Sequence, residues 1–201
     1  MNKRDLGIAA LSAAIISLLT IPTINNLPLP EAMVALGTRN VAILLGVLTL
    51  GGYVLSQFLG KWIGVFRQIG KFAVVGILNT VLDFAVLNTL ISISGISEGS
   101  MASTFKGVSF IIAVVNSYYW NKHWTFSFKG KVEREFLQFL VVSLIGFGIN
   151  VGVFSFVVNV LGSGGPLWAN LGALAGTAVS FTWNFLGYKF IVFKPQGLAK
   201  S

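Results

Sequence analysis

One acidic residue lies inside a long apolar stretch and is the residue of this sequence best placed to do chemistry. Asp83 follows the start of the apolar stretch 72–93 by eleven residues, about 16 Å along a helix. If that helix crosses a membrane, an ionised carboxylate there costs about 3 kcal/mol or more and usually faces a bundle interior or a water-filled cavity. Asn79 lies one turn earlier on the same face. We expect no basic partner at this depth, so Asp83 is predicted to be protonated or bonded to amides.

Amide side chains in the other apolar stretches could line a polar seam together with Asp83. Such amides either hydrogen-bond helices to one another or bind a polar molecule. Two lysines at the ends of apolar stretches could hold a lipid phosphate or simply mark the membrane surface. Lys106 is expected to extend to that surface, with attraction to a phosphate headgroup as the alternative. The candidate substrate-binding residues are Asn79, Asp83, Asn116, Asn150, Asn184, Lys122 and Lys189.

The elements that must position these residues are apolar stretches about as long as membrane-spanning helices. The stretches are 6–24, 41–59, 72–93, 105–120, 136–161 and 167–188. The predicted fold is therefore all-α, a multi-pass transmembrane helix bundle with about six spans. The first stretch, after Lys3 and Arg4, also resembles a signal peptide, but no A-x-A cleavage site follows it, so we favour a retained span.

Composition supports a membrane protein and argues against several other classes. Hydrophobic residues make up 55% of the 201 residues and charged residues 10%, against about 25% charged in soluble domains. The absence of cysteine and the single histidine, His123, argue against a metal site or a catalytic triad. With no sizeable polar domain to bind a sugar nucleotide, we expect neither an enzyme nor a cofactor. The net charge of +8 is spread over the ends of apolar stretches, so no nucleic-acid partner is expected.

The basic residues predict the orientation of the spans. With six spans, all but two of the 14 lysines and arginines fall on one side of the membrane, the exceptions being Arg39 and Lys106. Because basic loops stay in the cytoplasm, both termini are predicted to be cytoplasmic. The polar loop 127–135 is expected at the same surface, near anionic membrane lipid.

An internal repeat appears when the chain is shifted by 67 positions. Residues 67–126 then align without gaps on 134–193, and Phe72, Lys122 and Phe126 fall on identical residues. Each unit would hold two spans and enter the membrane from the same side, which makes the repeats parallel. The predicted domains are thus an N-terminal two-helix transmembrane hairpin, 1–60, and a four-helix transmembrane domain, 67–194.

Three segments carry a resemblance to a known family. Segment 76–84, with Asn79, Thr80 and Asp83, resembles the GxxNTxxDF signature of the GtrA-like membrane proteins. Segment 121–126 resembles the N-[KR]-x-W-x-F ending of the following helix, and 184–193 looks like the ending of the last helix. The resemblance implies a four-span protein of cell-surface polysaccharide or lipid-linked sugar pathways, with Asn79 and Asp83 as motif residues. The hairpin 1–60 departs from the family pattern.

Three functions follow as hypotheses. The first, implied by the resemblance and by the buried polar residues, is binding and translocation of a polyprenyl-phosphate-linked sugar. The second is a membrane anchor that recruits a polyprenyl-phosphate glycosyltransferase, for which loop 127–135 and the added hairpin 1–60 would matter more than the core of the bundle. The third is a proton-coupled exporter of small molecules, with Asp83 as the proton carrier. Four core spans form a small enclosure, so a homodimer is a reasonable expectation.

Overall fold

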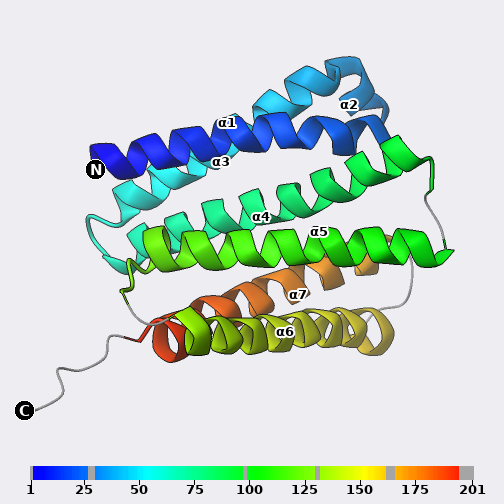
Figure 1. Cartoon of the computed structure of the whole chain (residues 1–201). Helices are drawn as coiled ribbons and strands as arrows, with labels where there is room; N and C mark the ends of the chain where they lie inside the picture. The colour runs from blue at the N-terminus through cyan, green and yellow to red at the C-terminus, as the bar shows by residue number, and fades with distance from the viewer. Residues whose placement is uncertain (1, 27–29, 97–98, 130–131, 162–165, 195–201) are drawn as a thin grey trace, which may run out of the picture. The chain divides into compact units, whose positions relative to one another are not determined.

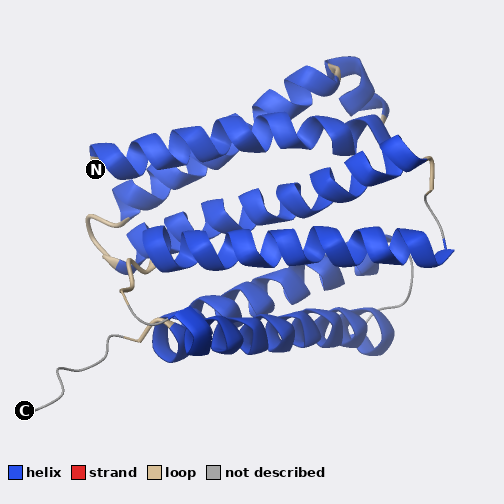
Figure 2. Ribbon diagram, in the orientation of Figure 1, coloured by secondary structure: helices blue, strands red, loops and turns tan. Residues whose placement is uncertain are grey.

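Helices make up all the regular structure of the residues that the structure describes. The structure is a computed structural model, and it describes residues 2–26, 30–96, 99–129, 132–161 and 166–194. No strand occurs among them (Figure 2). The prediction of an all-α fold is confirmed. The α-helices are α1 (Lys3–Asn26), α2 (Glu31–Leu36), α3 (Thr38–Leu59), α4 (Val65–Ser94), α5 (Gly99–Trp120), α6 (Val132–Phe156) and α7 (Pro166–Gly187) (Figure 1).

Each predicted span lies in one long helix or in that helix and the π-helical turn after it: stretch 136–161 continues from α6 through η2 (Val157–Leu161), and stretch 167–188 ends one residue past α7. Several helices are longer than their apolar stretches. Helix α4 begins at Val65 rather than at residue 72, and α5 begins at Gly99 rather than at residue 105. The residues that precede each apolar stretch are partly polar, but polar residues can still form the backbone hydrogen bonds of a helix, so both helices start earlier than hydropathy predicts. The short α2 was not predicted. Gly95, with φ of 71°, ends α4, and its N–H donates to the Ile91 carbonyl at 2.8 Å, a conformation that favours glycine.

Several of these helices have the length and composition of membrane spans. Four described helical segments qualify on those two grounds: Lys3–Asn25, Thr38–Leu59, Val65–Ser94 and Glu135–Leu161. Helices α5 and α7 have 22 residues each, which corresponds to about 33 Å at 1.5 Å per residue. The chain is therefore a helical membrane protein, and the number of six crossings stays a prediction.

Hydroxyl side chains inside the helices bond back to their own backbone. Thr20, Thr49 and Ser143 each donate to the carbonyl four residues earlier, at 2.7 to 2.8 Å. In an apolar surrounding, a hydroxyl without a partner is costly, and this local bond satisfies it without a second helix. The helices can therefore carry serine and threonine and still present an apolar surface.

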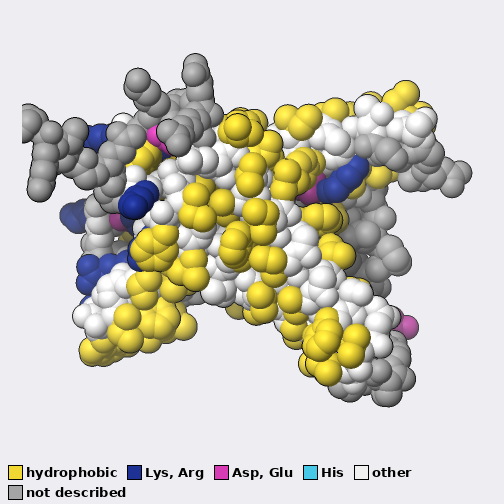
Figure 3. Space-filling view, turned by 90° about the horizontal axis from the view of Figure 1, so that it is seen from below, with side chains coloured by type: hydrophobic (Ala, Val, Ile, Leu, Met, Phe, Trp, Pro, Cys, Tyr) yellow, Lys and Arg dark blue, Asp and Glu magenta, His cyan; other side chains and the backbone are white. Residues whose placement is uncertain are grey.

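Apolar side chains cover much of the surface of the described residues. Leu18, Ile93, Phe147 and Leu174 are among the most exposed of them, and similar side chains extend along every long helix. Figure 3 shows one face on which hydrophobic side chains predominate. A water-soluble protein avoids apolar patches of this size, whereas hydrocarbon solvates them. The outer faces therefore suit contact with lipid.

The chain divides into two compact units, residues 1–127 and 128–201. In the first unit α1 packs against α3 and α4, α3 against α4, and α4 against α5. Its core contains Ala9, Tyr53, Val74, Val75 and Trp124. The N-terminal hairpin thus packs directly on α4. The predicted domains 1–60 and 67–194 were defined by the repeat in the sequence and not by contacts, so the boundary between them stays a prediction.

In the second unit α6 packs against α7, with stacked aromatic rings near the end of the hairpin. The rings of Phe139 and Tyr188 lie 4.4 Å apart between centroids, with Phe193 beside both. Phe139 is almost fully buried. Aromatic burial of this kind stabilises the contact between the two helices. Residues 130–131 of the predicted docking loop, and 162–165, lie outside the described residues.

Contacts recur at positions 67 apart in the two α4–α5 and α6–α7 hairpins. Each second helix continues into one π-helical turn, η1 (Asn121–Thr125) and η3 (Tyr188–Val192). Phe72 meets Phe126 at 6.4 Å between ring centroids, and Phe139 meets Phe193 at the same separation. The hairpins therefore share one internal register, which supports duplication as the origin of the repeat.

Candidate functional site

An ion pair joins the two helices of the α4–α5 hairpin, between the second half of α4 and the first half of α5. The ammonium nitrogen of Lys106 on α5 lies 2.5 Å from Asp83 Oδ2 on α4. The hydroxyl of Ser109, one turn after Lys106 and fully buried, donates to Asp83 Oδ1 at 2.6 Å. Both carboxylate oxygens are thus engaged by α5. The ring of Phe84 lies 5.7 Å from the same ammonium.

This pair corrects two sequence-based expectations. Asp83 was expected to lack a basic partner, and Lys106 to extend to the membrane surface; instead each is the partner of the other. The reason is the antiparallel hairpin, which brings a residue near the start of α5 level with one in the second half of α4. A lysine side chain is long enough to reach back along its helix rather than outward.

The two charges differ in accessibility. The side chain of Lys106 is 49% exposed and that of Asp83 is 19% exposed. An ion pair is far less costly in hydrocarbon than two separate charges, yet it still lacks the solvation that water provides. An ammonium group has three donors, and one neighbouring carboxylate does not use all of them. The exposed side of Lys106 is therefore suited to bind an anionic group.

Two predicted amides lie in the same hairpin, with one polar atom of each unsatisfied. Asn79 Oδ1 and Asn116 Nδ2 are buried without a hydrogen-bond partner among the described residues. Asn79 is one turn before Asp83 on α4, and Asn116 is two turns after Ser109 on α5. An unsatisfied amide in an apolar interior costs about 1–3 kcal/mol. A hydroxyl-bearing ligand or water could supply the missing bonds.

In the α6–α7 hairpin, the positions that correspond to Asp83 and Lys106 are Asn150 and Ala173, which carry no charge. Asn150 donates to the hydroxyl of Ser180 at 3.2 Å. A Cβ added at Gly176 would lie 2.6 Å from the Asn150 carbonyl oxygen, so α6 and α7 approach closely there. Asn184 lies against Gly146 in the same way, and its Oδ1 has no hydrogen-bond partner among the described residues. These amides serve helix packing, and their role toward a ligand stays a prediction.

The two predicted lysines occupy the π-helical turns. Lys122 is buried, and its ammonium lies 3.3 Å from the Tyr118 hydroxyl and over that ring. Lys189 is half-buried and lies over the rings of Phe185 and Phe190. Since Tyr118 and Phe185 are also 67 positions apart, the cation–ring contact is common to both hairpins. Contact of either lysine with a lipid phosphate stays a prediction.

Comparison with known proteins assigns the family. The family described as GtrA/DPMS, transmembrane domain, matches residues 71–193, more than half of the chain. The chain belongs to the GtrA/DPMS family. It is also 30% identical over 130 residues to the uncharacterized membrane protein YngA of Bacillus subtilis (strain 168), a match that covers 63% of this chain and 80% of YngA. No solved structure matches the chain.

Membership of the GtrA/DPMS family confirms the resemblance seen in the sequence motifs. It supports a membrane protein in processes that involve carrier-linked sugars. Asp83, Lys106 and Ser109 all lie inside the matched region, whereas α1, α2 and α3 lie before it. The ion pair is thus a feature of the GtrA/DPMS region itself, and the first three helices are additional to it.

A polar cluster that sequence reasoning missed joins these additional helices to the GtrA/DPMS region. Asp5 on α1 lies 2.7 Å from the ammonium of Lys71 on α4, and the indole N–H of Trp124 donates to it at 3.0 Å. Trp124 is buried. No local pattern marks Asp5, because its partners are 66 and 119 positions away. The described residues contain no group of three metal-ligating side chains.

Proposed function

We propose that this GtrA/DPMS protein binds a polyprenyl-phosphate-linked sugar and assists its movement across the membrane. The observation that carries the proposal is the half-exposed ammonium of Lys106, held by Asp83 within the apolar surface of the α4–α5 hairpin. A phosphate that enters hydrocarbon needs a cation within the apolar surface, because an unpaired charge there is costly. The proposal assigns binding and transport, with no chemical step and no resident cofactor.

Each part of the ligand has a counterpart in the hairpin. The phosphate would take Lys106 as its partner, and the Asp83 carboxylate would then turn to a sugar hydroxyl, a donor that also suits the free Oδ1 of Asn79. The Nδ2 of Asn116 could donate to a further hydroxyl oxygen. The prenyl chain would stay in lipid against the exposed apolar faces. When Lys106 exchanges partners, the phosphate is paired with a cation, and the Asp83 carboxylate keeps the hydrogen bond from Ser109 and gains one from the sugar hydroxyl, which limits the cost in hydrocarbon.

The test measures transport of a fluorescent polyprenyl-phosphate-linked sugar in proteoliposomes. Lys106→Gln and Asp83→Asn should each lower the rate at least tenfold, because each removes one member of the exchanging pair. Arg39→Gln removes an exposed cation at the start of α3 and should leave the rate unchanged. Equal rates in Lys106→Gln and Arg39→Gln would refute the proposed site.

A second arm separates transport from anchoring. We propose a polyprenyl-phosphate glycosyltransferase as a protein partner, with both termini on the cytoplasmic side where such an enzyme has its substrate. Under the transport proposal, Lys106→Gln still co-purifies with the transferase. Under the anchor alternative, transport in proteoliposomes is absent in the unmodified protein as well, and only transferase binding remains. Cross-linking in membranes would test the proposed homodimer.

A further inference from the structure

A second polar site lies in the first unit, outside the region that matches the GtrA/DPMS family. A pocket of about 490 Å³ opens between the start of α1, the end of α3 and the start of α4. It is lined by Asn2, Asp5, Val54, Gln57, Phe58, Lys61 and Arg67. Every one of these residues precedes residue 71, where the family match begins. The pocket therefore belongs to the additional helices and their junction with α4.

The walls of the pocket carry an excess of positive charge. Lys61 and Arg67 belong neither to the Asp5–Lys71 ion pair nor to the Asp83–Lys106 ion pair. The one carboxylate that lines the pocket, Asp5, is already bound by Lys71 and by the Trp124 indole. The Asp5–Lys71 pair is neutral as a unit, so Lys61 and Arg67 set the charge that a ligand meets.

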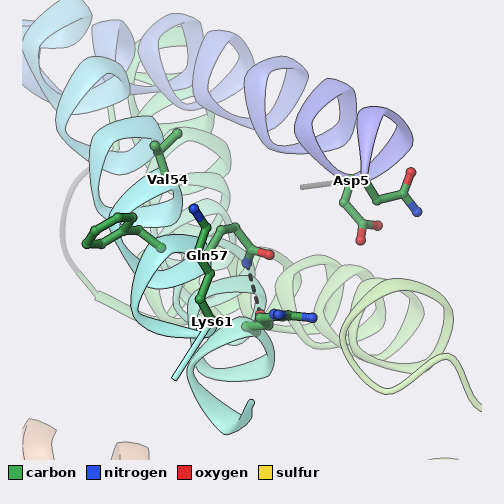
Figure 4. A pocket seen from close by; sticks show the side chains of 7 residues that line it. Asp5, Val54, Gln57 and Lys61 are labelled. Carbon is green, nitrogen blue, oxygen red and sulfur yellow. Dashed lines mark hydrogen bonds between the residues drawn. The ribbon is translucent and has the colours of Figure 1, made fainter. Parts of the chain in front are cut away.

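The local structure holds these cations in place. The side-chain amide of Gln57 donates to the Arg67 carbonyl at 3.2 Å, the dashed line in Figure 4, and so ties the end of α3 to the start of α4. A Cβ at Gly60 would collide with the Arg67 side chain, so the glycine lets that side chain lie against the turn. Lys61 lies 5.2 Å from the Phe58 ring. Figure 4 shows Asp5 on the helix opposite Val54, Gln57 and Lys61.

One wall of the pocket is apolar. Val54 and Phe58 are 42% and 49% exposed on α3, next to the cations rather than separated from them. A ligand that fits both parts has a phosphate attached to an apolar chain. Arginine can bind phosphate in a bidentate manner and lysine adds a point charge. Cations at the end of membrane-spanning helices meet the headgroup level, where such ligands are abundant.

We propose that this pocket binds the phosphate of an anionic phospholipid, with the headgroup at Lys61 and Arg67 and an acyl chain along Val54 and Phe58. The bound lipid would cover the junction between the additional helices and α4. Lys106 does not line this pocket, so the lipid site can be tested independently of the transport proposal.

The test is native mass spectrometry of the detergent-purified full chain titrated with phosphatidylglycerol. The double variant Lys61→Gln/Arg67→Gln should bind at least tenfold more weakly than the unmodified protein. The control double variant Arg39→Gln/Lys129→Gln removes the same charge from exposed positions elsewhere and should bind as the unmodified protein does. Lys61→Arg/Arg67→Lys keeps both cations and should retain most of the binding. Thermal unfolding checks that all variants are folded.

Two further probes distinguish the source of the phosphate. Phosphatidylcholine, whose headgroup has no net charge, should bind at least tenfold more weakly, and millimolar inorganic phosphate should not displace phosphatidylglycerol. Displacement by inorganic phosphate would overturn the lipid assignment in favour of a free anion. Equal loss of binding in the pocket and control variants would overturn the site altogether.

Discussion

Ser109 and Gly176 occupy equivalent places in the two hairpins, each against the residue 26 positions earlier on the preceding helix. Ser109 donates to Asp83, whereas Gly176 lets the backbone of Asn150 approach. One hairpin therefore uses this place for a charged, hydrogen-bonded contact, and the other uses it for close packing. The difference concentrates the charge in the first hairpin and makes the second depend on a small residue.

The close approach in the second hairpin predicts a large effect of a single methyl group. Gly176→Ala would place a Cβ 2.6 Å from the Asn150 carbonyl oxygen, which is backbone and can move only with its helix. We expect a loss of about 1–3 kcal/mol in the free energy of unfolding, as for other overpacked sites. Thermal unfolding in detergent, followed by intrinsic fluorescence, measures the change.

Gly152→Ala is the matched control for that variant. A Cβ there would meet no atom within 4 Å, and Gly152 is an exposed residue of α6. Because alanine favours helix over glycine by up to about 1 kcal/mol, the control should be neutral or slightly more stable. If the two variants unfold at the same temperature, the close packing of α6 on α7 is wrong at this point.

The ion pair predicts non-additive effects on stability. Asp83→Asn and Lys106→Gln should each destabilise the protein, because each leaves a charge of the 2.5 Å pair without its partner. The double variant should be less destabilised than the sum of the two, with an interaction free energy of about 1–2 kcal/mol. A double-mutant cycle on unfolding in detergent measures this term.

Lys61→Gln combined with Asp83→Asn provides the control cycle. Lys61 is 22 residues from Asp83 along the chain and lies in the turn before α4, so the two changes share no partner. Their effects should add within about 0.5 kcal/mol. An interaction term of the same size in both cycles would mean that Lys106 is not the specific partner of Asp83.

Asp5 is predicted to hold the additional helices on the GtrA/DPMS region. Asp5→Asn removes the charge that Lys71 pairs with at 2.7 Å and weakens the acceptor for the Trp124 indole. We expect a loss of about 1–3 kcal/mol, as when a partly buried charged group loses its partner. Glu31→Gln removes one carboxylate from an exposed position at the start of α2 and should change the unfolding temperature little. Equal stability of the two variants would contradict the structural role of Asp5.

Much of the fold could be predicted from local patterns. Apolar stretches near 20 residues long mark helices suited to a membrane, because lipid requires every backbone group to bond within its own segment. The six stretches each correspond to a long helix, and the motif with Asn79 and Asp83 indicated the family that the comparison confirmed. The 67-residue offset also lies in the sequence and recurs in the contacts of Phe72 and Phe139.

By itself, the sequence determined that this is a helical membrane protein with one exceptional acid at position 83, since hydropathy and residue type are properties of the chain alone. Only the tertiary structure decided that Lys106 is the partner of Asp83, that Asp5 binds Lys71 and Trp124, and that Lys61 and Arg67 line one pocket. These pairings depend on how far each helix slides and rotates against its neighbour. Packing of whole helices sets those two quantities, so no local pattern contains them.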